Sequence, residues 1–265
     1  MHIIGIGGLK RSGKDTFARV IADVARGDGF AVAVIAFADA VRQAAAAAYG
    51  VDASIFTDDA RKETICEAWG ITYQQMLINL GEAMRGVDAD HWVKAWRRAA
   101  SAYNKTKCVF CRGSGEDRTQ PRVADGGHGF YLDCPACKGA PLPALVLVPD
   151  LRCVNEAQMI HEAGGLTVLM RRPGVEWNGH ETEVLAHLAQ HRDDFKAASL
   201  GCWYAREEPM WLHYNPTTPR APICRRFYDT AIDNPVAVGA HATADDTAKL
   251  HSQAVALLLQ VRRGL

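Results

Sequence analysis

The chain has 265 residues, 48% of them hydrophobic, so it can bury the core of one large domain or of one domain with an insert. Its 30 basic and 30 acidic residues cancel, which argues against a nucleic-acid or membrane surface. No apolar stretch approaches about 18 residues, and the start lacks the features of a signal peptide. We therefore expect a cytoplasmic protein (in the host cytoplasm if phage-encoded), whose eight cysteines are thiols or metal ligands rather than disulfides.

Apolar runs that alternate with helical segments predict an α/β fold. The apolar runs expected as strands cover residues 3–7, 31–37, 144–148, 166–170 and 229–233, the third ended by Pro149 and Asp150. Helical spacing predicts helices at about 17–27, 39–49, 73–86, 90–103, 154–163, 181–197 and 244–262, while residues 51–72 read as polar and irregular. This order indicates a three-layer sandwich, in which a parallel sheet has helices on both faces and binds ligands at the carboxyl ends of its strands.

The first apolar run leads directly into a glycine-rich loop, Gly8-Leu9-Lys10-Arg11-Ser12-Gly13-Lys14-Asp15-Thr16. This G-x-x-x-x-G-K pattern between a strand and a helix is typical of a P-loop, whose backbone N–H groups surround the phosphates while Lys14 neutralises the β and γ oxygens. The alternative is a glycine-rich turn that binds nothing. We expect ATP at Gly8, Lys10, Arg11, Ser12, Gly13, Lys14, Asp15 and Thr16.

The residue after the loop lysine is Asp15, where a Ser or Thr that binds Mg²⁺ is usual. This difference favours the kinase branch of P-loop proteins over a GTPase-like switch. The sequence leaves open whether Asp15 is a ligand of the Mg²⁺ that accompanies ATP or a general base.

Two cysteine pairs, Cys108-x-x-Cys111 and Cys134-x-x-Cys137, stand 22 residues apart, and a glycine follows shortly after each pair. Four thiolates at this spacing predict one structural Zn²⁺, bound by Cys108, Cys111, Cys134 and Cys137. Residues 104–143 would then form a zinc-binding insert that needs the metal to fold. The core would consist of residues 1–103 and 144–265. The alternative is four free thiols in a loop.

The loop at residues 8–16 resembles the P-loop of phage-type deoxynucleoside monophosphate kinases, which read G-x-K-x-S-G-K-D-T. Other segments resemble this family's motifs in the same order. They are residues 37–42, 77–82, 92–94, 148–156 (for D-x-R-x-x-x-E) and 180–183, with a looser match at 232–234. The resemblance implies a P-loop fold and ATP-dependent phosphorylation of a nucleoside monophosphate. It also implies that Arg152 binds the acceptor phosphate and Glu156 the nucleoside.

Other side chains are candidates because of their position. Asp150 ends an apolar strand, where it could hold Mg²⁺ through water, and Arg172 follows a strand end, where a lid arginine could reach the transferred phosphate. The residues expected to bind the acceptor are Asp39, Arg42, Arg61, Trp92, Asp150, Arg152 and Glu156. Those expected to act in catalysis are Lys14, Asp15, Arg152 and Arg172.

The chain departs from the family pattern in the acceptor region. Gln74 and Gln75 stand roughly where the family carries Arg-Lys, and Glu82 replaces its Thr. These differences leave open an acceptor with a non-standard base.

Two alternative functions stay open. With Asp15 or Asp39 as a general base, the enzyme would phosphorylate a hydroxyl group, such as that of a hydroxymethylated pyrimidine in DNA. The zero net charge argues against nucleic acid as a partner without excluding it. A non-catalytic module that binds ATP is the other alternative, and a homodimer is left open.

Overall fold

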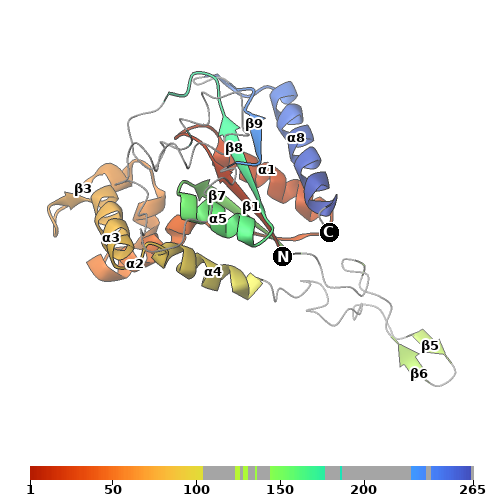
Figure 1. Ribbon diagram of the computed structural model, residues 1–265, viewed down its shortest axis with the longest axis horizontal. Coiled ribbons are helices and arrows are strands. Elements are labelled where there is room, and N and C mark those ends of the chain that lie inside the picture. Colours follow the sequence, from red (N-terminus) through yellow and green to blue (C-terminus); the bar gives the residue numbers. More distant parts are fainter. Residues whose placement is uncertain are drawn as a thin grey trace, which may run out of the picture.

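The computed structural model describes residues 1–103, 144–176, 228–236 and 240–263, with short pieces at 123–125, 128–130, 135 and 186. In this part of the chain, five strands form one sheet in the order β2-β7-β1-β8-β9, and every neighbouring pair is parallel. The strands are β1 (His2–Gly7), β2 (Ala31–Val34), β7 (Ala144–Leu151), β8 (Leu166–Arg171) and β9 (Thr230–Asp233) (Figure 1). The predicted α/β fold with a parallel sheet is confirmed.

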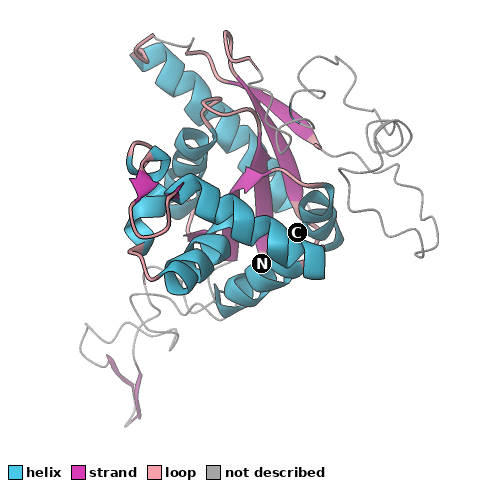
Figure 2. Ribbon diagram, turned by 90° about the vertical axis from the view of Figure 1, so that its left-hand side faces the viewer, coloured by secondary structure: helices cyan, strands magenta, loops and turns pink. Residues whose placement is uncertain are grey.

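Helices cover both faces of this sheet (Figures 1 and 2). One face packs against α1 (Lys14–Gly27) and α8 (Ala244–Arg263), and the other against α4 (His91–Tyr103) and α5 (Val154–Glu162). Successive strand residues point to opposite faces, so Ile4 belongs to the first core and its neighbour Ile3 to the second. Because both faces are buried, the strands are continuously apolar, which made them recognisable in the sequence.

A smaller helical unit stands beside the sheet, between β2 and β7 in the chain (Figure 1). Its elements are α2 (Phe37–Tyr49), the 3₁₀ helices η1 (Ala53–Thr57) and η2 (Arg61–Glu63), the strands β3 (Ile65–Cys66) and β4 (Ile71–Thr72), and α3 (Tyr73–Val87). Phe56, Cys66 and Met76 are buried in its own core. Residues 51–72, expected to be irregular, therefore form two short helices and a hairpin.

The order of the strands determines where a ligand can bind. β1 lies in the middle of the sheet, with β7 and β2 on one side and β8 and β9 on the other. In open parallel sheets, ligands bind beyond the carboxyl ends of the strands at the point where the chain direction divides. Here that point is the end of β1, at the upper edge in Figure 1, where residues 8–13 lead into α1.

Two strand ends differ from the prediction. β7 continues through Pro149 and Asp150 to Leu151, because the register with β1 shifts between Gly5 and Gly7 and leaves one extra residue on β7. Pro149 has no N–H to donate, and such an irregularity tolerates it. β2 ends at Val34 rather than residue 37, and α2 begins at Phe37.

The other boundaries of described elements agree with the prediction within about three residues. The predicted helix at 181–197 lies outside the described residues apart from residue 186, and so do the four predicted zinc ligands. Within the expected insert, the structure describes an antiparallel pair, β5 (Val123–Asp125) and β6 (His128–Phe130). No helix in the described part of the chain is long and apolar enough to cross a membrane.

Candidate active site

The loop that follows β1 is held in a conformation that two of its glycines make possible. Gly8 has a φ of 142° and Gly13 a φ of 98°, both in the region that side chains disfavour. A Cβ on Gly8 would lie 2.5 Å from the carbonyl oxygen of Met170, and one on Gly13 would lie 2.4 Å from Nδ2 of Asn234. Neither position can therefore carry a side chain without displacing the neighbouring strand ends.

Lys14 begins α1, and its ammonium group lies against the loop. Its Nζ donates hydrogen bonds to the carbonyl oxygens of Gly8, at 2.8 Å, and Leu9, at 2.7 Å. The side chain of Ser12 is 1% exposed, and no described residue makes a hydrogen bond with its buried Oγ. The ammonium group of Lys14 and the hydroxyl of Ser12 thus lie in one loop, where a bound anion could accept hydrogen bonds from both.

Asp15 and Thr16 follow on the first turn of α1, and both are exposed. Their carboxylate and hydroxyl are hard oxygen donors, the kind that Mg²⁺ prefers, and Mg²⁺ commonly needs only one or two protein ligands beside substrate phosphates. The residues present therefore fit an ion that binds together with ATP. In the described residues, no cluster of three or more His, Cys, Asp or Glu side chains forms a metal site on its own.

Arg172, expected near the transferred phosphate, lies beside the loop. Its Nη1 donates to the carbonyl oxygen of Arg11 at 3.1 Å and its Nε to that of Val236 at 2.6 Å. The preceding Arg171 forms a bidentate ion pair with Asp233, at 2.8 and 3.1 Å. The structure therefore brings Arg172 to the glycine-rich loop, and its part in catalysis stays a prediction.

The turn at η2 lies on the other side of the loop. Nζ of Lys10 is 3.8 Å from Oε1 of Glu63, and both side chains are largely exposed. The hydrogen bond and the positive charge from Lys62 lower the pKa of Asp59, and Lys10 and Arg11 lower it further. Arg61, a predicted acceptor ligand, is exposed at the start of this same turn.

Asp150 connects the sheet edge to the helical unit. Its Oδ1 accepts a hydrogen bond from the N–H of Phe37 at 2.9 Å and its Oδ2 from that of Ala38 at 2.8 Å, so it caps the N-terminus of α2. Burial raises the pKa of Asp150, although these hydrogen bonds and the charges of Arg152 and Arg42 oppose the rise. The predicted Mg²⁺ or acceptor ligand is thus a capping group at the same edge as the P-loop.

Glu156 is a buried capping residue of α5. It is 4% exposed, and its Oε2 accepts from the backbone N–H groups of Arg152, at 2.8 Å, and Cys153, at 2.9 Å. Burial and the nearby charge of Asp150 raise the pKa of Glu156 to about 7, against the effect of the two hydrogen bonds and of Arg85. The expected pair of Arg152 and Glu156 therefore meets through the backbone of Arg152, whose own side chain is exposed.

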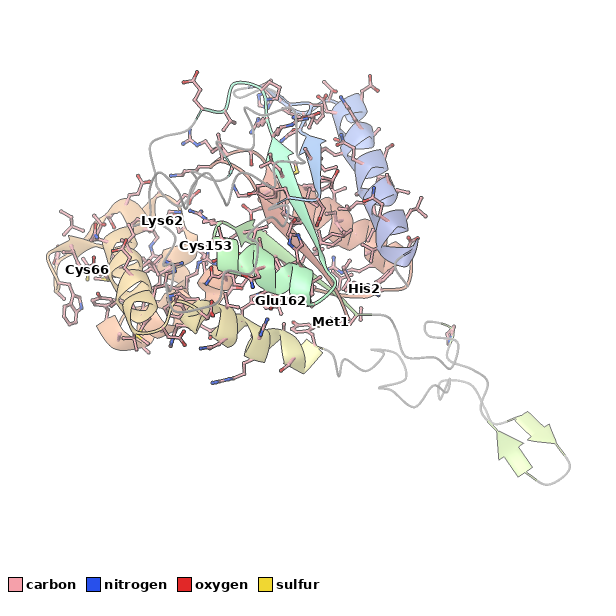
Figure 3. All side chains as sticks on the ribbon, in the orientation of Figure 1. Met1, His2, Lys62, Cys66, Cys153 and Glu162 are labelled. Carbon is pink, nitrogen blue, oxygen red and sulfur yellow. The ribbon has the colours of Figure 1, made fainter. Side chains whose placement is uncertain are left out.

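Three arginines from separate parts of the chain act on these two carboxylates. Arg42 on α2 and Arg152 act on Asp150, whereas Arg85 on α3 acts on Glu156 and Cys153. Figure 3 labels Cys153, which lies between α5 and the α2–α3 unit. The positive charges of Arg42, Arg85 and Arg152 thus act on the carboxylates at the end of β7 and the start of α5.

Arg42 is partly buried and paired within α2. Its Nη1 donates to Oδ1 of Asp39 at 2.7 Å, and Oδ2 of Asp39 accepts from the N–H of Ala36 at 2.8 Å. Nε of Arg42 is buried and forms no hydrogen bond with any described residue. Both oxygens of Asp39, which the sequence offered as a general base, are thus engaged within the protein.

Arg85 was not predicted from the sequence, yet its charge acts on Glu156. A Cβ on Gly81, one turn earlier in α3, would lie 3.8 Å from Nη1 of Arg85, so the guanidinium folds back over this glycine. A glycine four residues before an arginine in a helix leaves room for the guanidinium, and this local signal was present in the sequence. Nothing in α3 alone, however, indicates that Glu156 is nearby. Trp92, a predicted acceptor residue, is 4% exposed and donates from Nε1 to the carbonyl oxygen of Gly81 at 3.0 Å. Its contact with the acceptor stays a prediction.

Comparison with protein-family models finds no family that matches the chain, and comparison with curated proteins finds no matching protein. The function must therefore be argued from the motifs and from the geometry of the site.

Proposed function

We propose that this protein is a P-loop kinase that transfers the γ-phosphoryl group of ATP to a nucleoside or deoxynucleoside monophosphate. The observation that carries the proposal is the loop after β1, where Nζ of Lys14 lies against the carbonyl oxygens of Gly8 and Leu9 and the buried hydroxyl of Ser12 has no described partner. At the end of the adjacent β7, the charges of Arg42 and Arg152 act on Asp150 and that of Arg85 acts on Glu156, so we assign the acceptor phosphate to these arginines. A reaction between two phosphate groups requires two such sites close together.

In this proposal the protein contributes position and charge. The loop N–H groups and Lys14 hold the phosphates of ATP, and the arginines hold the acceptor phosphate in line. Mg²⁺ bound with ATP would neutralise charge on its phosphates, and Asp15 and Thr16 are the residues that would hold it. Arg172 and the η2 turn with Arg61 flank the loop, where they would enclose the transferred group.

The engagement of Asp39 supports a phosphate acceptor over a hydroxyl acceptor. A hydroxyl acceptor needs a base to remove its proton, whereas a monophosphate is already ionised near neutral pH. Asp39 uses one oxygen for Arg42 and the other for the N–H of Ala36. Of the two bases that the sequence offered, only Asp15 is then available.

The decisive experiment measures ADP formation by a coupled assay with a panel of nucleoside and deoxynucleoside monophosphates, including bases with modified substituents. We expect turnover only when a monophosphate is present. The K14A variant should lose on the order of 2.7–4 kcal/mol of transition-state stabilisation, by analogy with the loss of one oxyanion donor. The surface variant K94A, which breaks the pair between Lys94 and Asp88, serves as control.

Each other outcome identifies a different function. Turnover with a nucleoside or with hydroxymethylated DNA, but with no monophosphate, would indicate a hydroxyl kinase. ATP binding without turnover on any acceptor would indicate a binding module.

A further inference from the structure

Asn234, which follows β9, touches the P-loop from the far side of β8. It is 6% exposed, and its Nδ2 donates to the carbonyl oxygen of Ser12 at 3.1 Å. Its Oδ1 accepts from the N–H of Val236 at 3.1 Å, and its own N–H donates to the carbonyl oxygen of Arg171 at 2.7 Å. These bonds fix the orientation of the amide, because only its NH₂ group can meet a carbonyl.

The hydrogen bond from Asn234 is made to the peptide group between Ser12 and Gly13, whose carbonyl must point away from a phosphate bound in the loop. Ser12 precedes Gly13, and the hydrogen bond keeps the carbonyl between them directed at Asn234 and therefore away from a bound anion. Gly13 has a φ of 98°, and a Cβ there would collide with Nδ2 of Asn234. Gly13 therefore leaves the space that the Asn234 amide occupies. Asn234 and Ser12, whose carbonyl oxygen it binds, are 222 residues apart in the sequence.

A second contact holds the neighbouring peptide. Arg11 has a φ of 69°, a left-handed conformation that costs energy in a residue other than glycine and persists only when its surroundings hold it. Nη1 of Arg172 donates to the carbonyl oxygen of Arg11, and Nε of Arg172 donates to Val236, whose N–H is held by Asn234. Two successive carbonyls of the loop are therefore held from the ends of β8 and β9.

We infer that Asn234 is a positioning residue, which keeps the P-loop in its phosphate-binding shape without touching ATP. The inference depends on the proposed function, since it assigns Asn234 to the donor site. Loss of the amide should release the Ser12–Gly13 peptide and weaken the binding of any polyphosphate, while the acceptor site stays intact.

The experiment uses the full chain and measures affinity for a fluorescent ATP analogue and for inorganic tripolyphosphate as its competitor. In N234A, both ligands should bind about fivefold more weakly, the effect expected for one lost hydrogen bond. The KM for the acceptor should change by less than about twofold, because in the described part of the chain Asn234 makes no hydrogen bond with the proposed acceptor residues. Tripolyphosphate has no base or ribose, so an equal loss for both ligands locates the effect in the loop.

The isosteric variant N234D separates positioning from packing. At about pH 8 its carboxylate cannot donate to the Ser12 carbonyl, and we expect ATP binding weaker than in N234A. A carboxyl group buried against the Ser12 carbonyl has a raised pKa, so lowering the pH to about 5 restores an O–H donor, and the ratio of variant to wild-type dissociation constants should fall. A purely structural role would give no such recovery relative to the wild type.

Asn155 offers a matched control, because its Nδ2 likewise donates to a distant part of the chain, to the carbonyl oxygen of Ala89 and to Oδ1 of Asp90, and not to the loop. N155A should lower thermal stability and leave tripolyphosphate binding unchanged. Wild-type affinity for both ligands in N234A would overturn the inference, as would a loss for ATP without a loss for tripolyphosphate. If the wild-type chain binds neither ligand, the proposed function fails and the inference fails with it.

Discussion

The carboxylate of Asp150 accepts a hydrogen bond from the N–H of Phe37 at 2.9 Å, across 113 positions of sequence. This bond joins the end of a central strand to the first turn of α2, the helix that carries Arg42. In the proposed function, this link would help to set the distance between the loop that holds ATP and the arginines that hold the acceptor.

Removing the cap should loosen that geometry. In D150A, the N–H groups of Phe37 and Ala38 lose their acceptor, at a cost of about 1 kcal/mol in the free energy of unfolding. The burial that raises the pKa of Asp150 also makes its charge costly in the folded protein, so the removal of this charge offsets part of the loss. We expect the KM for the acceptor to rise more than that for ATP, because α2 moves and the P-loop does not.

Chemical denaturation and steady-state kinetics test this together. D52A is the control, since the exposed Asp52 caps η1 by accepting a hydrogen bond from the N–H of Ser54. A D150A variant as stable as the wild type, or one that loses affinity for both substrates equally, would contradict the role given to the cap.

Arg85 should be as important for the acceptor as the sequence-predicted Arg152. The R85A variant is expected to raise the acceptor KM at least tenfold, since a charge-assisted hydrogen bond contributes about 1.5–3 kcal/mol, with little change for ATP. R85K should restore little, because an ammonium group cannot form a two-pronged contact with a phosphate. R97A is the matched control, in which an exposed helix arginine loses its pair with Glu162. Equal KM values for R85A and R97A would remove Arg85 from the site.

The donor loop and the region of Asp150 and Arg85 show which features the sequence could predict. The strands of the five-stranded sheet and the helices that cover it have local patterns, in apolar runs and helical spacing, and in the described residues they were predicted nearly in full. Asp150 was predicted as a site residue from its place at a strand end, but its contact with Phe37 has no local signature. The end of β2 at Val34 could not be predicted either.

Arg85 and Asn234 show the same limit. Both are single polar residues within ordinary helical or strand-end segments, and their roles depend on partners that only the fold brings near. Asn234 appeared in a loose match at residues 232–234, yet nothing near it in the chain indicates Ser12. Local patterns predict elements, whereas the pairing of distant polar groups requires the three-dimensional arrangement.

Glu156 should make stability depend on pH near neutrality. Its pKa is raised from the usual 4.5 to about 7, so between these values the folded protein keeps a proton that the unfolded chain has lost. Stability therefore decreases as the pH rises through this window and stays low above it. The amide of E156Q does not titrate, and its oxygen can still accept from the N–H groups of Arg152 and Cys153. The free energy of unfolding of E156Q relative to that of the wild type should therefore rise by up to about 3 kcal/mol from pH 4.5 to 7.

Urea denaturation of both proteins at several pH values measures this difference. E162Q, a change at the exposed end of the same helix, should show no comparable increase. A constant difference between E156Q and the wild type across the window would mean that Glu156 is not the buried acid that the structure shows.

The cysteine-rich insert should bind one structural Zn²⁺ that takes no part in phosphoryl transfer. Cys108 and Cys111 precede the β5–β6 hairpin in the chain and Cys134 and Cys137 follow it, an order in which one metal could join the two sides of the insert. Four cysteine ligands leave no open position for water or substrate.

Metal analysis should find about one zinc per chain, lost in the double variant C108S/C111S and kept in C66S, whose thiol is buried in the α2–α3 unit. Without zinc, the P-loop core should still bind ATP, because its sheet is held by its own apolar faces. Protein that is free of zinc with all thiols reduced, or a zinc-depleted variant that loses ATP binding, would contradict this assignment.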